Sequence, residues 1–175
     1  VTVMTMKPDQ IAAAWTQEAI DAAFIWPPAQ TEILKTGKRI ASAKDTAEWG
    51  YPTFNAWTVN SEFLASHEKE VAAFAKAMDA ANMAYLKDPA AWTPDNEQVK
   101  AIASVTGATA EQIPEILKGY NFIPLKDQVS DTWLGSAPKS LKATADFLKS
   151  VGRIDTVAED YSKFVTTAVA EEAQK

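Results

Sequence analysis

Hydrophobic and polar positions in the first part of the chain fall into two alternating kinds of run. Short runs rich in β-branched and aromatic residues predict strands, and segments bounded by proline and glycine predict helices. The strands are expected over residues 1–6, 20–26 and 38–43, with helices over 8–19 and 27–37. The run at 20–26 is apolar throughout, as is typical of a strand buried on both faces. Strands that alternate with helices predict a parallel α/β layer.

Beyond residue 48 the pattern becomes mostly helical. One more strand is predicted over 52–60, and a long helix follows Ser61. Its apolar face is expected to consist of Val71, Phe74, Met78, Ala81 and Tyr85. Further helices are expected over 95–107, 109–119, 136–152 and 156–175. The change of pattern predicts a boundary near Glu48, between a part at 1–48 and a part at 49–175.

Composition limits the classes of function. The 175 residues are 47% hydrophobic and carry a net charge of −6, without a basic patch that could follow a phosphate backbone. We therefore expect no nucleic-acid partner. No apolar run reaches the ~20 residues of a membrane span, and no signal peptide is visible. Because the first residues already have the pattern of a strand, we expect that the N-terminal part of the protein lies outside this chain.

Residues that could carry out catalysis are scarce. The sequence has no cysteine and one histidine, His67, which lies among charged residues near a predicted helix start. A metal site needs several converging ligands, and a nucleotide site usually needs a glycine-rich loop; neither pattern occurs. We therefore predict no catalytic residue, no metal site and no cofactor, and we interpret His67 as a surface residue.

The segment "EWGYPTFNAW" at 48–57 combines aromatic residues with turn formers and one amide. Aromatic side chains beside a polar group are typical of ligand clefts. Trp26 and Pro27 follow the predicted strand at 20–26, at the end where ligands bind in parallel α/β layers. For Trp26 and Trp49, core packing and a ligand-lining position are equally compatible with the sequence, whereas Trp15 and Trp133 fit core packing better.

Three motifs carry a resemblance to a known family. "QIAAAWTQEAIDAAFIWPPAQTEILKTGKRI", "EWGYPTFNAWTV" and "TADFLKSVGRIDTVAEDYSKFVT" resemble the taurine-binding and aliphatic-sulfonate-binding periplasmic proteins of ABC importers. The resemblance implies the C-terminal, helix-rich part of an α/β, type II periplasmic binding protein, with two lobes joined by a hinge. Residues 1–48 would belong to lobe two, and 49–175 would form the hinge crossing and the C-terminal part of lobe one.

The resemblance also implies a function and a site. The protein would be a periplasmic, secreted receptor that captures a small organosulfonate and delivers it to an ABC permease in the inner membrane. We expect Trp26, Trp49, Tyr51 and Asn55 to line the cleft, with Pro27 and Thr53 shaping its walls. The absent N-terminal part would supply the main donors to the anion. Asp21 is interpreted as structural.

Two positions depart from the family pattern. Taurine receptors typically place an aspartate at the position of Asn55, where it meets the ligand's ammonium group, and a glycine at the position of Glu18. An amide cannot form an ion pair, although it can accept and donate hydrogen bonds. We expect Glu18 to alter the helix end without touching the ligand.

The altered residue at position 55 leaves alternatives open. The ligand could be another small anion, such as nitrate, a carboxylate or an amine-free sulfonate, and Asn55 could simply be a strand residue. An enzyme of pyrimidine metabolism on the same fold and a stand-alone interaction module are the rival functions.

Overall fold

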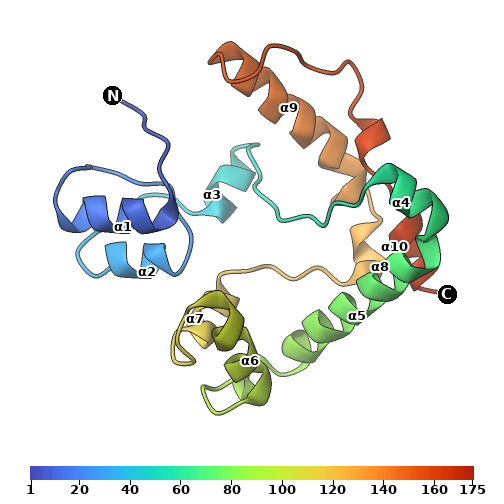
Figure 1. Cartoon of the computed structure of the whole chain (residues 1–175), viewed down its shortest axis with the longest axis horizontal. Coiled ribbons are helices and arrows are strands. Elements are labelled where there is room, and N and C mark those ends of the chain that lie inside the picture. Colours follow the sequence, from blue (N-terminus) through green and yellow to red (C-terminus); the bar gives the residue numbers. More distant parts are fainter. The chain divides into compact units, whose positions relative to one another are not determined.

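The computed structural model describes all residues from 1 to 175 and separates into two compact units. The first unit combines residues 1–42 with 90–121, and the second combines 43–89 with 122–175. Every regular element is an α-helix or a short 3₁₀-helix (Figure 1). The helix-rich character expected from the sequence is therefore confirmed.

The predicted strands are absent, so this part of the sequence interpretation is corrected. Residues 1–6 precede the first helix, and 20–26, 38–42 and 51–60 connect helices; none of them pairs as a strand. A helix closes its hydrogen bonds within one segment, whereas a strand needs a neighbouring strand for its N–H and C=O groups. None of these segments has a partner strand, and Val3, Phe24 and Ile40 within them remain exposed. The parallel layer expected over 1–48 is not formed.

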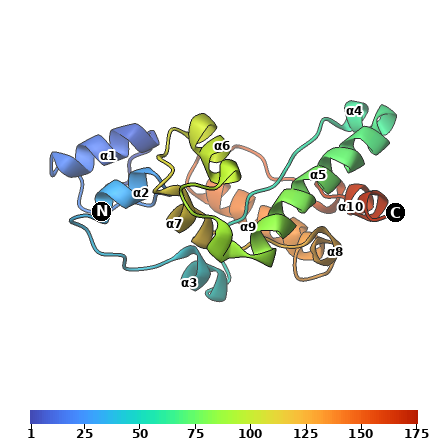
Figure 2. The same ribbon diagram turned by 90° about the horizontal axis from the view of Figure 1, so that it is seen from below.

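The first unit contains two pairs of helices. α1 (Pro8–Thr16) packs against α2 (Ala29–Ile33), where Ala14, Ala29 and Ile33 are buried (Figure 2). The indole Nε1 of Trp15 donates to Thr36 Oγ1 at 2.9 Å. A Cβ atom added to Gly37 would lie 2.8 Å from the Trp15 ring, so only glycine fits beside it. Trp15 is therefore a packing residue.

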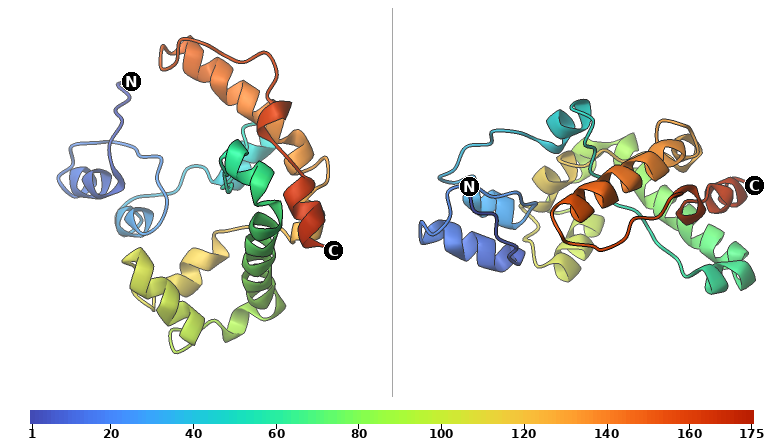
Figure 3. Two further views of the ribbon diagram at one scale, coloured as in Figure 1. Left: turned by 45° about the vertical axis from the view of Figure 1, so that its right-hand side comes forward. Right: turned by 90° about the horizontal axis from the view of Figure 1, so that it is seen from above.

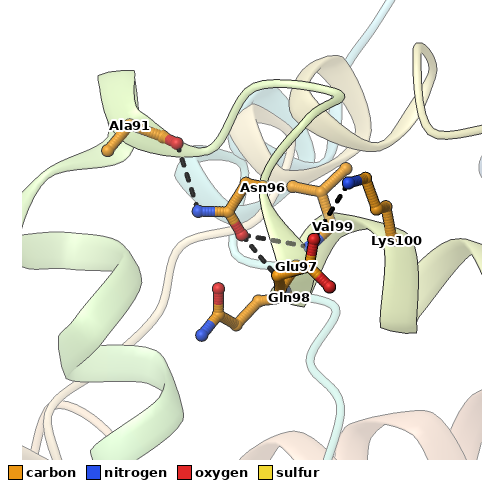
Figure 4. A network of polar contacts seen from close by, with 6 residues as sticks. All are labelled: Ala91, Asn96, Glu97, Gln98, Val99 and Lys100. Atoms are coloured by element: carbon orange, nitrogen blue, oxygen red, sulfur yellow. Dashed lines mark hydrogen bonds and ion pairs between the residues drawn. The ribbon is translucent and has the colours of Figure 1, made fainter.

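The second pair of helices is held by buried aliphatic residues and a polar cap. α6 (Glu97–Thr106) and α7 (Ile113–Lys118) bury Val99, Ile113 and Leu117. The Asn96 side chain caps the start of α6. Its Oδ1 accepts from the backbone N–H of Gln98 at 2.9 Å, and its Nδ2 donates to the Ala91 carbonyl at 3.2 Å (Figure 4). One amide thus ties the helix to the turn before it.

The second unit is built around α5 (Glu68–Lys87), which α4 (Ser61–Ser66) precedes. α10 (Ala168–Ala173) and α8 (Leu125–Gln128) pack against it (Figure 3). Their shared core contains Ala72, Leu125, Ala170 and Ala173. The Asp79 carboxylate accepts a 2.7 Å bond from the Leu125 N–H, so α5 caps the start of α8. Small residues and this cap together let the three helices approach closely.

The predicted apolar face of α5 is only partly correct. Tyr85 is buried and Val71 and Met78 are half-buried, as expected, whereas the contact with α8 and α10 uses Ala72 and Ala75. On the predicted face, Phe74 meets Trp57 edge-on at 5.1 Å between ring centroids, and Tyr85 meets Phe122 at 5.2 Å. Ala81 between them is exposed. The long residues of α5 therefore contact loop aromatics, while the helix contacts use small residues.

The last predicted helix, over 156–175, is also corrected. Only η3 (Ser162–Phe164) and α10 form there, after α9 (Ala137–Ser150). The Asp160 carboxylate accepts from the Ser162 N–H at 2.8 Å and from its hydroxyl at 2.7 Å. These bonds lower the pKa of Asp160. A local side-chain bond of this kind competes with the helical ladder, which explains the interruption.

Several helices end in the same backbone turn. After α1, Ala19 N donates to Ala14 O at 2.9 Å and Glu18 N to Trp15 O at 3.0 Å. After α9, Arg153 N donates to Leu148 O at 2.8 Å. In such a turn one residue takes the left-handed conformation, where glycine fits without a Cβ clash. Gly152 occupies it after α9 with φ 70°, but Glu18 occupies it after α1 with φ 54°. Glu18 thus takes a conformation that glycine adopts more easily, and the expectation that it does not touch the ligand stays a prediction.

We predict that Glu18→Gly stabilises the protein by about 0.5–1 kcal/mol, because it relieves the left-handed strain of a residue with a Cβ. Urea unfolding measures the change. Glu18→Gln is the control for the lost charge at the helix C-terminus, and it should stabilise less than glycine. Gly152→Ala should act in the opposite direction. Equal midpoints for Glu18→Gly and the wild type would contradict this account of the turn.

Large apolar side chains are exposed in both units. They include Phe24, Trp26, Ile40, Trp49, Tyr51, Phe54, Trp57, Phe147 and Phe164. Monomeric soluble proteins rarely expose contiguous apolar patches above a few hundred Å². We predict that the 175-residue chain, expressed alone, binds a hydrophobic dye or aggregates. A soluble monomer with a sharp cooperative melt and no dye binding would overturn this expectation.

Candidate functional site

Trp26 and Pro27 lie at the start of α2 in the first unit. The Trp26 carbonyl accepts from the Gln30 N–H at 3.1 Å, and Gln30 Nε2 donates to the Ile25 carbonyl at 3.1 Å. A cis peptide bond joins Pro27 to Pro28. The two hydrogen bonds of Gln30 tie the backbone at Ile25 and Trp26 to α2, while the Trp26 side chain stays 56% exposed. Trp26 follows an extended segment, as expected, but that segment is not a strand.

Trp49 and Tyr51 follow the end of α3 (Ala43–Glu48) in the second unit. Gly50 between them has φ 92°, and Tyr51 N donates back to Thr46 O at 2.8 Å. This is the same left-handed turn that ends α1 and α9. It explains the glycine of the "WGYP" motif, because the chain must reverse there. Trp49 is 63% exposed and Tyr51 73% exposed, so neither is a core residue.

Thr53 and Asn55 follow on the extended segment that leads to α4. Both side chains are exposed. The segment ends at Asn60, whose Oδ1 accepts from the N–H groups of Glu62 and Phe63 at 2.9 and 3.2 Å. A shallow hollow on this segment is lined by Asn55, Ala56 and Trp57. Asn55 is therefore a predicted site residue that lines a hollow.

Trp57 is absent from the residues that the sequence singled out as ligand contacts. The sequence could have identified Trp57 as a candidate, because it lies two residues after Asn55 and residues two apart on an extended segment face the same side. Trp49, Tyr51, Thr53 and Asn55 come from one continuous stretch of the second unit. Trp26 and Pro27 belong to the first unit. The joint action of both groups on one ligand stays a prediction.

The single histidine has a structural environment. His67 lies between α4 and α5, half-buried, with its ring stacked on Phe63 at 4.2 Å and 3°. Its Nδ1 lies 2.8 Å from Ser66 Oγ, and that hydroxyl donates to the Glu62 carbonyl at 3.1 Å. The pair thus completes the end of α4. The expectation of a plain surface histidine is refined to a helix-end residue.

A second hollow lies among α5, α8 and α10. It is lined by Lys76, Asp79, Met83, Pro124, Leu125, Lys126, Ala173 and Gln174. It contains no residue predicted from the sequence, and its carboxylate already caps α8. No group of three or more histidine, cysteine or acidic side chains is placed to hold a metal ion. No helix combines the length and apolar character that a membrane crossing requires.

Comparisons with known proteins identify relatives of the whole chain. It is 32% identical over 167 residues to the taurine-binding periplasmic protein of Escherichia coli, a match that covers 95% of this chain and 52% of the relative. It is 26% identical over 158 residues to a putative aliphatic sulfonates-binding protein of Bacillus subtilis, covering 89% of this chain and 43% of that protein. No family model matches.

The chain therefore spans about half the length of the curated relatives it matches. The matches cover 95% and 89% of it. The resemblance is thus confirmed, and the chain is related to the taurine-binding and aliphatic-sulfonate-binding proteins.

Proposed function

We propose that this chain is part of a solute receptor of an ABC importer that captures a small organosulfonate. The observation that carries this proposal is the match to a taurine-binding periplasmic protein along 95% of the chain. Both relatives are named as binding proteins, so the proposed role is capture without chemistry, and no part of it needs a catalytic residue. The proposed location is the periplasm, and the proposed partner is a permease in the inner membrane.

The proposed architecture is a type II, two-lobed α/β receptor. Residues 1–48 would belong to lobe two, and 49–175 to the hinge crossing and lobe one. The remaining half of the receptor would supply the strands that segments such as 20–26 and 51–60 lack. Their exposed apolar side chains support this proposal, because an unpaired apolar segment gains both hydrogen bonds and burial when it joins a sheet.

The proposed cleft residues are Trp26, Pro27, Trp49, Tyr51, Thr53 and Asn55. The exposed rings of Trp26, Trp49 and Tyr51 are free to contact a ligand. Asn55 lines a hollow and offers both donor and acceptor groups. The ligand would favour the closed receptor by contacting both lobes at once, and closure would present a surface to the permease.

Asn55 favours a second candidate ligand within the same class. The resemblance places an aspartate at this position in taurine receptors, where it meets the ammonium group. A hydrogen bond to a charged group contributes about 1.5–3 kcal/mol, compared with about 1 kcal/mol for a neutral one. Loss of the carboxylate therefore favours an amine-free sulfonate.

We predict that Trp26→Ala and Trp49→Ala each weaken sulfonate binding to the full receptor by more than ~1 kcal/mol. Ligand addition should also change the tryptophan fluorescence of the wild type. Trp133→Ala, in the second unit but outside the proposed cleft, serves as the control and should bind normally. If folded Trp26→Ala and Trp49→Ala receptors both retain wild-type affinity, the cleft assignment is wrong.

The preference between taurine and isethionate, its hydroxyl analogue, tests the role of Asn55. We predict that the full receptor does not strongly prefer taurine, because Asn55 offers the ammonium only a neutral acceptor. Asn55→Asp should shift the preference toward taurine by about 1–2 kcal/mol, the gap between charged and neutral hydrogen bonds. Calorimetric titration of both ligands measures the shift.

A matched variant distinguishes a direct contact between residue 55 and the ligand from the general effect of an added negative charge. Asn60→Asp adds the same negative charge nearby and keeps the oxygen acceptor that caps α4. It should leave the preference unchanged. A wild-type receptor that binds taurine far more tightly than isethionate would mean that another acidic group meets the amine. Failure of the wild type to bind any sulfonate would overturn the proposed function.

A further inference from the structure

Trp57 combines a fixed ring with an open face. Its side chain is 74% exposed, yet the ring meets Phe74 of α5 at 5.1 Å between centroids and 88° between planes. Edge-to-face contacts of this kind add about 0.5–1.5 kcal/mol beyond burial. The contact therefore limits the motion of the indole while most of its surface remains accessible. An aromatic wall of a ligand site needs both properties.

The hollow beside Trp57 shares one residue, Asn55, with the proposed ligand site. Asn55, Ala56 and Trp57 line it together, and its surface is mainly apolar. The ring belongs to the same unit as Phe74 and Asn55. Such a surface fits a molecule with a polar end and a short apolar chain, because the ring can cover methylene groups while the amide contacts the polar end.

We propose that Trp57, positioned by Phe74, is the wall against which the alkyl chain of the bound sulfonate packs. This inference rests on the proposed function and deepens it. Asn55 would sense the substituent at the end of the chain, whereas Trp57 would sense the length of the chain. Trp57 contacts the ligand, and Phe74 acts only as a positioning residue.

Chain-length dependence of affinity tests this role. Methanesulfonate, ethanesulfonate, propanesulfonate and butanesulfonate share an anion and lack an amine, so they isolate the apolar contact. Each methylene group buried against Trp57 should lower the Kd of the full receptor by about fourfold, until the hollow is filled. In Trp57→Ala the Kd should become nearly independent of chain length, while binding of methanesulfonate changes by less than about twofold.

Further variants separate the ligand contact from folding. Phe74→Leu should reduce the chain-length dependence, and Phe74→Tyr, which keeps the ring, should retain it. Trp57→Phe, a milder change, should reduce it in part. Trp133→Phe is the matched control and should leave it unchanged. Loss of stability alone would not alter the dependence of Kd on ligand length in the folded fraction.

The outcomes distinguish this inference from the proposed function. The role of Trp57 is overturned, and the proposed function is not, if the wild-type Kd does not depend on chain length. The same holds if the dependence survives in both Trp57 variants. Binding of taurine without any alkylsulfonate would overturn it as well. Absence of binding to taurine and to the whole series would overturn the proposed function together with this inference.

Discussion

A helix satisfies its backbone hydrogen bonds within one segment, and this constraint decides which parts of the chain take regular structure. Segments with helical periodicity, such as α5 and α9, close their backbone hydrogen bonds without a partner segment. Segments 20–26 and 51–60 have the side chains of strands but no neighbouring strand, so they stay extended and exposed. The second unit is accordingly held together by short helix contacts, built from small residues such as Ala72 and Ala170.

The ends of helices position the candidate site. Gly50 ends α3 with a left-handed turn and thereby separates Trp49 from Tyr51, and Asn60 begins α4 and ends the segment that carries Asn55. Glu18 occupies the same kind of turn after α1, where a residue with a Cβ atom adopts the left-handed conformation less easily than glycine does. The sequence therefore tolerates a strained residue before the segment that leads to Trp26. Position 18 affects the stability of that connection and lies outside the proposed ligand contacts.

Local signals made much of the helical structure predictable. Pro8 marks the start of α1, Gly107 marks the end of α6, and Gly152 marks the end of α9. The helix expected at 156–175 failed because Asp160 bonds to Ser162, a choice that depends on a side-chain rotamer and not on periodicity. The packed face of α5 was missed because alanine contributes little to an apolar pattern, although it permits close helix contact. Asn55 and the aromatic cluster were recognisable from residue type, whereas the edge contact that fixes Trp57 depends on Phe74, which lies 17 residues further along the chain.

The division of the proposed cleft between two lobes has a thermodynamic consequence. In the proposed architecture Trp26 belongs to lobe two and Asn55 to the hinge crossing and lobe one, so neither lobe alone would hold all the groups that contact a ligand. A ligand shifts a conformational equilibrium only by the difference in its affinity for the two states. In the proposed receptor, contacts made by a single lobe would exist in the open and the closed form and would drive no closure. Closure would depend on contacts that the other lobe adds, and a side chain that is already held in place but still exposed suits that role. The ring of Trp57 has both properties, because its contact with Phe74 holds it while 74% of the side chain stays exposed, so it loses little further freedom when a ligand reaches it.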